Sequence, residues 1–193
     1  RLGVVALISA VVVPTGVVGG LAFALANDGN GDMTLKPGAS AVADTGVSFV
    51  DGQGEVTYVL PGRPATGSAY LGLELRTTAG SMYRTKARVY PDGTLTVDLG
   101  KVVGKGAEQF LGTKRIPAVV GTGTTSITVQ GNVTGSKVAV RAFVAGTTVP
   151  AWQLTVTDSS AFSTAGSVRA WAYLSRQATS SLKLKYQGLA ATK

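Results

Sequence analysis

Residues 70–98 read YLGLELRTTAGSMYRTKARVYPDGTLTVD, and this stretch decides the fold. It contains three segments in which apolar and polar side chains alternate, separated by Thr-Thr-Ala-Gly-Ser and Pro-Asp-Gly. A two-residue period bounded by turn residues is typical of β-strands that are buried on one face. The stretch therefore predicts a meander of three antiparallel strands.

The alternation also predicts how these strands pair, because only one face of each can be buried. A leucine face in the first strand needs an apolar partner face, and the second strand has one such face and one with Arg84, Lys86 and Arg88. Placing the apolar faces together gives four facing pairs: Leu75 with Tyr83, Leu73 with Thr85, Val89 with Leu95, and Ala87 with Val97.

The same pairing sets Glu74 opposite Arg84 and Lys86 opposite Asp98 on the outward face. Such cross-strand pairs contribute only about 0.2–1 kcal/mol each, but they neutralise the basic stripe. A nucleic-acid groove would leave the cations bare and interleave them with stacking aromatic rings. We therefore predict a solvated face here and no nucleic-acid binding.

Short alternating segments separated by Gly, Pro, Asp and Ser turns continue to the end of the chain, which predicts an all-β sandwich or barrel. No helix of ordinary length is predicted in this region. Beside the meander (69–76, 82–90 and 94–103), the expected strands are 46–50, 54–60, 107–111, 124–131, 137–144, 151–157, 167–174 and 181–187.

Several short motifs occur in a recognisable order. They are Tyr-Arg-Thr-Lys-Ala-Arg-Val at 83–89, Asp-Gly-Thr at 92–94, Pro-Ala-Trp-Gln-Leu-Thr-Val-Thr-Asp-Ser at 150–159, Ala-Gly-Ser-Val at 165–168 and Ala-Tyr-Leu-Ser at 172–175. Together they resemble the LamG-like, concanavalin-type jelly-roll modules of actinobacterial cell-surface proteins, over roughly residues 50–190. The resemblance implies a two-sheet antiparallel jelly roll. That superfamily includes glycan-binding modules, glucanases and structural spacers, so the resemblance leaves function open.

Residues 1–26 read RLGVVALISAVVVPTGVVGGLAFALA, with no charge after Arg1 until Asp28. About 20 apolar residues suffice to span a bilayer, so we expect an N-terminal hydrophobic α-helix. Three roles remain open: a cleaved secretory signal, a membrane anchor, and a pilin-like helix buried in a filament core. The segment lacks the glutamate usual near the start of bacterial type IV pilins. The side chains expected to make assembly or membrane contacts are Leu2, Val5, Leu7, Val12, Val17, Leu21 and Phe23.

We thus expect three parts: the helix at 1–26, a linker at 27–45 and the β-sandwich domain at 46–193. Within the linker, Asp28, Asn30 and Asp32 have the spacing that begins a calcium-binding loop. Ala39 stands where such a loop needs a bidentate acid, so calcium is the lesser alternative to a plain linker.

The composition excludes several kinds of chemistry. The 193 residues include no Cys and no His, which removes thiolate nucleophiles, histidine bases and zinc sites built on either residue. The net charge of +8 comes from scattered Lys and Arg, which favours a generally basic surface over a nucleic-acid site. No Glu-x-Asp-x-Glu pattern of the jelly-roll glucanases occurs. We therefore expect no enzyme, cofactor or metal site.

Aromatic side chains give the one specific lead beyond the N-terminal segment. In 167–174 the outward face shows Arg169, Trp171 and Tyr173, and in 137–144 it shows Arg141 and Phe143. Such residues bind sugar rings, form subunit contacts, or simply pack under a loop or the N-terminal segment. Trp152 is expected in the core beside Leu154 and Val156.

Two functions from different classes follow. The first is a structural, adhesive subunit at the cell surface, assembled pilin-like or anchored through 1–26. The alternative is a carbohydrate-binding, lectin-like module of a secreted or membrane-anchored protein, which binds a cell-surface glycan through the outward aromatics. Both place the chain outside the cell, exported through its hydrophobic segment.

Overall fold

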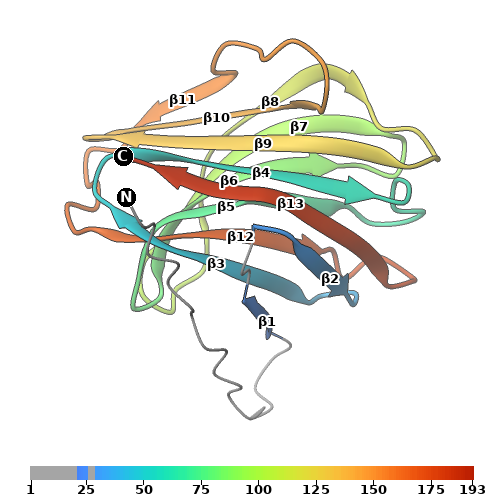
Figure 1. Ribbon diagram of the computed structural model, residues 1–193, viewed down its shortest axis with the longest axis horizontal. Coiled ribbons are helices and arrows are strands. Elements are labelled where there is room, and N and C mark those ends of the chain that lie inside the picture. Colours follow the sequence, from blue (N-terminus) through green and yellow to red (C-terminus); the bar gives the residue numbers. More distant parts are fainter. Residues whose placement is uncertain (1–20, 26–28) are drawn as a thin grey trace, which may run out of the picture.

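Two β-sheets packed face to face form the molecule in a computed structural model that describes residues 21–25 and 29–193 (Figure 1). The seven-stranded sheet has the order β1 (Leu21–Leu25), β3 (Ser40–Phe49), β12 (Gly166–Leu174), β5 (Ala69–Thr78), β6 (Ser81–Val89), β7 (Thr94–Val102) and β8 (Gln109–Val119). The six-stranded sheet has the order β11 (Leu154–Thr157), β10 (Lys137–Val144), β9 (Thr125–Thr134), β4 (Gly52–Leu60), β13 (Leu182–Thr192) and β2 (Gly31–Leu35). Six strands of the first sheet and all of the second pair antiparallel, and β1 joins β3 in parallel. The predicted two-sheet, all-β sandwich is confirmed.

The meander of β5, β6 and β7 has the predicted register. Leu75 faces Tyr83, Leu73 faces Thr85, Ala87 faces Val97 and Val89 faces Leu95. The first turn is tighter than expected, because β5 continues to Thr78 and β6 begins at Ser81. A bulge between Leu75 and Thr78 accommodates this, and Arg76 within it has a φ of 50°.

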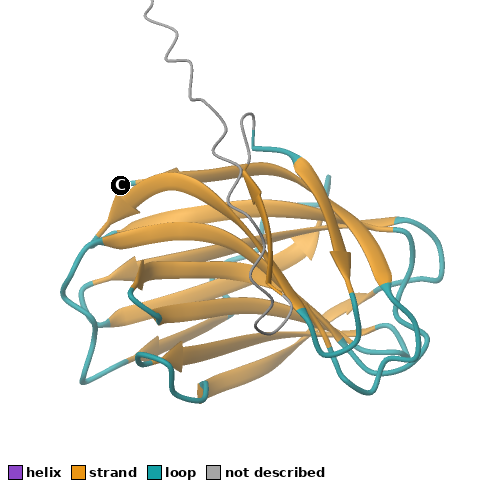
Figure 2. Cartoon of the chain, turned by 90° about the horizontal axis from the view of Figure 1, so that it is seen from below, coloured by secondary structure: helices purple, strands orange, loops and turns teal. Residues whose placement is uncertain are grey.

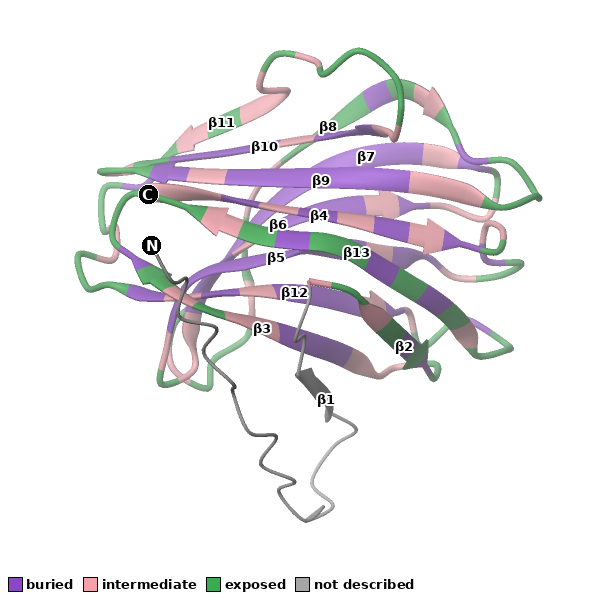
Figure 3. Cartoon of the chain, in the orientation of Figure 1, coloured by how far each residue is buried: buried purple, intermediate pink, exposed green. Residues whose placement is uncertain are grey.

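Side chains from the facing sides of the two sheets form the core (Figure 3). Along β12 the predicted inward residues Val168, Ala170, Ala172 and Leu174 are all buried. The colours of several strands alternate between buried and more exposed residues, which is the pattern that a half-buried strand must have. The local apolar period thus determines which side chains enter the sandwich.

The described residues contain no helix (Figure 2), and therefore none long and apolar enough to cross a membrane. The predicted helix at 1–26 is wrong at its C-terminal end, because Leu21 and Phe23 lie in strand β1. Pairing with β3 explains this, since an edge strand offers unpaired backbone groups that a further strand can satisfy. The other predicted assembly residues, Leu2, Val5, Leu7, Val12 and Val17, lie outside the described residues.

The predicted linker at 27–45 is also wrong, because it contains β2 and the first half of β3. Met33 and Leu35 in β2 are buried in the core, as are Ala41 and Ala43 in β3. Turn residues on both sides of the five-residue β2 hide it from a periodicity argument, and only the second half of β3 was predicted, as the strand at 46–50. The sandwich therefore begins about one strand pair earlier than the sequence indicated.

Two buried cations hold the loops at one end of the sandwich. The Arg76 guanidinium donates to the carbonyl oxygens of Val50, Gly135 and Phe162, and its Nη2 lies 2.9 Å from Asp51 Oδ1. These contacts gather three loops around one side chain that is 1% exposed. This cluster holds the three loops together at that end of the sandwich.

Nearby, Lys101 Nζ lies 2.7 Å from Asp158 Oδ2, and the Tyr83 hydroxyl donates to the same oxygen at 2.6 Å. Phe162 packs on Tyr83, with ring centres 4.9 Å apart, and the Lys101 ammonium lies 4.7 Å from the Phe162 ring centre. The ion pair therefore ties the loop after β11 to the meander.

Candidate functional site

The outward face of the seven-stranded sheet brings polar and aromatic side chains into three rows across its strands. The first row is Asp44, Arg169, Glu74, Arg84, Gly100 and Phe110. The second row is Val42, Trp171, Gly72, Lys86, Asp98 and Thr113. The third row is Ser40, Tyr173, Tyr70, Arg88, Thr96 and Arg115. The predicted residues Arg169, Trp171 and Tyr173 thus share a face with the cations of β6.

A cleft of about 380 Å³ opens in the middle of this face. Its lining residues are Ser40, Tyr70, Arg84, Lys86, Glu108, Trp171 and Tyr173. Gly72 lies between Trp171 and Lys86 and has no side chain to fill the space. A Cβ added to Gly72 would lie 2.2 Å from the carbonyl oxygen of Thr85, so the close approach of β5 and β6 requires glycine here. The volume falls within the range of about 300–1,000 Å³ that is usual for small-molecule sites.

Arg84 is the centre of the charged network in the cleft. Its Nε and Nη2 lie 3.1 and 2.9 Å from Glu74 Oε1, and its Nη1 lies 3.1 Å from Glu108 Oε2. The other oxygen of Glu108 accepts a hydrogen bond from Lys86 Nζ. Glu108 therefore bridges two cations that come from alternate positions of β6.

The expectation of a solvated face is wrong, although the pairing of Glu74 with Arg84 is confirmed. Glu74, Lys86 and Asp98 are only 3–6% exposed. Lys86 faces Asp98 in the register, but its ammonium bonds to Glu108, while Asp98 accepts hydrogen bonds from the hydroxyls of Thr96 and Thr113. Burial raises the pKa of Glu74, and the adjacent Arg84 guanidinium opposes that rise.

Trp171 forms a wall of the cleft and is only 5% exposed. The Arg84 guanidinium carbon lies 4.5 Å from the centre of its ring, and the Tyr173 ring is stacked at 6.1 Å with an interplanar angle of 14°. Of the three roles expected for the outward aromatics, these contacts favour packing for Trp171, because its neighbours leave little of the indole free. Trp171 therefore packs between Arg84 and Tyr173 in the cleft.

The tyrosines supply the aromatic surface that remains accessible. Tyr70 and Tyr173 are half-buried, and their ring centres lie 5.7 Å apart at an angle of 47°. The Arg88 guanidinium lies 5.0 Å from the centre of the Tyr70 ring on the other side. At the edge of the same face, Arg169 Nε bonds to Asp44 Oδ2 at 3.1 Å, so Arg169 borders the cleft without lining it.

Arg141 and Phe143 are not brought to this site, because β10 belongs to the six-stranded sheet. Phe143 is 9% exposed, and the Arg141 guanidinium lies 4.4 Å from the centre of the Trp152 ring. The expected core position of Trp152 is wrong: the ring is partly exposed under Arg141, and β11 begins only at Leu154. Arg141 and Trp152 thus form a separate stacked pair on the opposite layer.

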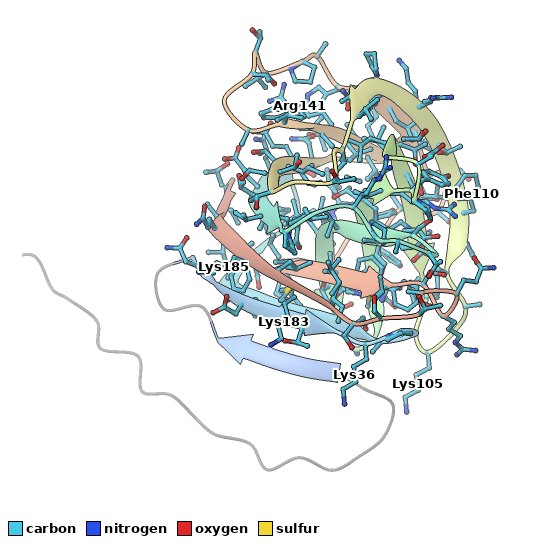
Figure 4. All side chains as sticks on the ribbon, turned by 90° about the vertical axis from the view of Figure 1, so that its right-hand side faces the viewer. Lys36, Lys105, Phe110, Arg141, Lys183 and Lys185 are labelled. Carbon is cyan, nitrogen blue, oxygen red and sulfur yellow. The ribbon has the colours of Figure 1, made fainter. Side chains whose placement is uncertain are left out.

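Sequence reasoning missed Tyr70, Glu108 and Phe110, and it assigned Arg84 and Lys86 to a solvated surface. Phe110 is 66% exposed on the outward side of the seven-stranded sheet, at the right of Figure 4. The signal that could have identified Phe110 was an aromatic residue on the outward face of a strand, where polar residues are expected. Glu108 lies in the predicted strand 107–111, but β8 begins only at Gln109, so strand alternation did not show that its side chain contacts Arg84 and Lys86.

A second cleft, of about 510 Å³, lies on the six-stranded layer by β2 and β13. Lys183 and Lys185 contribute to it and lie across the molecule from Phe110 (Figure 4). Its lining carries no aromatic ring. We therefore take the cleft at Arg84 as the candidate site.

The expected calcium ligands are partly outside the described residues, since Asp28 is not among them. Asn30 Oδ1 accepts a hydrogen bond from the Gly188 backbone N–H at 3.0 Å, and Asp32 lies in β2. Among residues 21–25 and 29–193, no group of three acidic side chains gathers into a metal site.

Comparison with known proteins identifies the fold. No family model matches the chain, and no curated protein matches it in sequence. Among solved structures, it is similar to the carbohydrate-binding module CBM66 from Bacillus subtilis, with 14% identity, 87% of this chain and 84% of that chain covered, and a TM-score of 0.54. It is also similar to a native glycosidic hydrolase, with 10% identity, 83% of this chain and 76% of that chain covered, and a TM-score of 0.53. The β-glucanase of Bacillus licheniformis is similar too, with 12% identity, 84% of this chain and 78% of that chain covered, and a TM-score of 0.52. The chain therefore has a concanavalin-like jelly-roll fold, while the narrower LamG-type assignment rests on the sequence motifs alone.

Proposed function

We propose that the protein is a non-catalytic carbohydrate-binding module whose site is the outward face of the seven-stranded sheet. The observation that carries this proposal is the cleft in which Tyr70 and Tyr173 lie beside Arg84, Lys86 and Glu108. Aromatic rings pack against the C–H faces of sugars, and charged groups exchange hydrogen bonds with their hydroxyls. A shallow cleft with both kinds of group suits a sugar ring.

The arrangement of carboxylates favours binding over catalysis. A glycosidase of this kind needs two carboxyl groups about 5–10 Å apart with the scissile bond between them. Glu74 and Glu108 both accept hydrogen bonds from one guanidinium, so the Arg84 side chain occupies the space between them. Asp98 is held by two threonine hydroxyls. This geometry leaves no two of these three carboxyl groups facing each other across a space for substrate.

The glycan-binding function takes precedence over the filament subunit. The filament hypothesis depended on a continuous helix at 1–26, and residues 21–25 form a strand instead. The cleft, by contrast, needs no partner chain to complete it. A location outside the cell is part of the proposal, since cell-surface and secreted polysaccharides are found there.

A glycan array probed with the protein and three variants tests this function. We expect Tyr70→Ala and Tyr173→Ala each to weaken binding about tenfold, because each loses a ring worth roughly 1 kcal/mol or more. Trp152→Ala is the matched control, since it removes a larger ring from the opposite layer. Equal losses in all three variants, or no glycan bound by the wild-type protein, would contradict the proposal.

A further inference from the structure

We propose that the glycan bound at this face is acidic, and that its carboxylate replaces the Glu108 carboxylate on Arg84 and Lys86. This inference rests on the proposed function and adds the chemical class of the ligand: a polysaccharide that contains uronic acid residues. Three features carry it, namely the Glu108 carboxylate in the cleft, and Gly100 and the exposed Phe110 beside Arg84 in the first row.

The Glu108 side chain already shows how a carboxylate is bound here. One of its oxygens lies 3.1 Å from Arg84 Nη1, and the other accepts from Lys86 Nζ. Two charge-assisted bonds to two different cations are the contacts that a sugar carboxylate would make. Glu108 is therefore an internal stand-in for the ligand group.

The fixed part of the network stays in place when Glu108 leaves. Arg84 turns its Nε and Nη2 toward Glu74, which lies buried in the sheet face, so Nη1 alone faces Glu108. Asp98 faces Lys86 in the register but is hydrogen-bonded to Thr96 and Thr113. Displacing Glu108 thus exposes one guanidinium nitrogen and one ammonium to an incoming anion.

Room for the sugar ring comes from Gly100. This glycine lies between Arg84 and Phe110 in the first row, and a Cβ added to it would lie 2.1 Å from Glu108 Oε1. The space above Gly100 is therefore where the Glu108 carboxylate now lies. Phe110 pairs with Gly100 across the strands and is 66% exposed, so its ring is accessible to the C–H face of a sugar bound beside Gly100.

Glu108 can leave by a side-chain movement. It ends the segment between β7 and β8, in which Lys105, Gly106 and Ala107 are exposed, and its own side chain is 23% exposed. Desolvation of its carboxylate is correspondingly incomplete, so water can replace its partners at modest cost. The net charge of +8 adds a long-range attraction for polyanions that salt will weaken.

The test measures binding of three acidic polysaccharides, polygalacturonate, alginate and hyaluronan, and of their carboxyl-reduced counterparts, which keep the chain but lose the charge. We expect at least one acidic polymer to bind, and its reduced form to bind about tenfold more weakly or worse. Polyaspartate is included as an acidic polymer without sugar rings, and we expect it to bind more weakly than the polysaccharide.

Glu108→Gln tests the internal carboxylate directly. The amide keeps the shape but cannot compete as an anion, so affinity for the acidic polymer should rise about threefold to tenfold. Glu55→Gln on the six-stranded sheet is the matched control, because its carboxylate bonds to Gln130 on the opposite layer. Gly100→Ala gives a second variant that fills the floor with one methyl group, and it should weaken binding.

The outcomes separate this inference from the function on which it rests. If the carboxyl-reduced polysaccharides bind as tightly as the acidic ones, and still through Tyr70 and Tyr173, the inference of an acidic ligand is overturned. The glycan-binding function would then remain intact. Weaker binding in Glu108→Gln, or polyaspartate that binds as well as the polysaccharide, would also overturn the inference of an acidic ligand. A protein that binds no glycan, acidic or neutral, would overturn both.

Discussion

Tyr58 shows how a single side chain supports the candidate site from beneath. It projects from β4 across the core, and its hydroxyl lies 2.8 Å from the carbonyl oxygen of Gly72 and 3.1 Å from that of Trp171. Both carbonyls belong to the strand pair that forms the cleft floor. Burial raises the pKa of Tyr58, so its hydroxyl stays a neutral donor at every ordinary pH. The two sheets are thus joined directly below the cleft.

Tyr58→Phe removes the hydroxyl that contacts the buried carbonyl oxygens of Gly72 and Trp171. We expect the free energy of unfolding to fall by about 1–3 kcal/mol, as measured by urea denaturation. Tyr90→Phe removes the same atom from a partly exposed ring and should change stability by less than about 0.5 kcal/mol. Equal effects of the two substitutions would show that the buried contact has no special role.

At the scale of single elements, the sequence predicted faces better than boundaries. Alternation placed Arg169, Trp171 and Tyr173 correctly on the outward face of β12, because inside and outside depend on local period alone. It could not show that Trp171 would be covered by Arg84 from β6, which depends on two intervening strand pairings. It placed Glu108 in a predicted strand at 107–111, whereas β8 begins only at Gln109 and Glu108 ends the connecting segment before it. The local sequence pattern predicts which face of a strand a side chain lies on. The cleft depends on which strands pair with each other, and the local pattern does not show that.

The segment that follows β11 gives a prediction about acid stability. Burial alone would raise the pKa of Asp158, but hydrogen bonds from Lys101, Tyr83 and Ser160 outweigh it and lower that pKa to about 2. A carboxyl group whose pKa is lowered on folding stabilises the protein above its unfolded pKa near 3.9, and that stability is lost as the pH falls toward 2. The contribution is about 2 kcal/mol.

Urea denaturation of wild-type protein and Asp158→Asn from pH 7 to pH 2 measures this contribution. At pH 7 the variant should be less stable by about 3–5 kcal/mol, because Lys101 is left buried without its carboxylate. Between pH 4 and pH 2 the stability of the wild-type protein should fall more steeply than that of the variant, by about 2 kcal/mol. Parallel curves would show that Asp158 is not the group responsible.

For the whole molecule, the two-sheet sandwich followed from local patterns, whereas the membership of each sheet did not. Phe143 and Trp171 both face outward, as predicted, yet they lie on opposite layers because β10 and β12 pair with different neighbours. The predicted sugar-binding group was therefore divided between two surfaces. Only the surface with β12 also receives the cations of β6 and the carboxylate of Glu108.

The two tryptophans of the chain, one on each layer, provide the most direct test of which surface binds glycan. Intrinsic fluorescence is recorded while the strongest ligand from the array is added to Trp152→Phe, which keeps Trp171, and to Trp171→Phe, which keeps Trp152. We predict a saturable change in emission from Trp171, which lines the cleft, and an unchanged signal from Trp152. A saturable change from Trp152 with a silent Trp171 would contradict glycan binding at the seven-stranded sheet, because it would place the ligand on the six-stranded sheet.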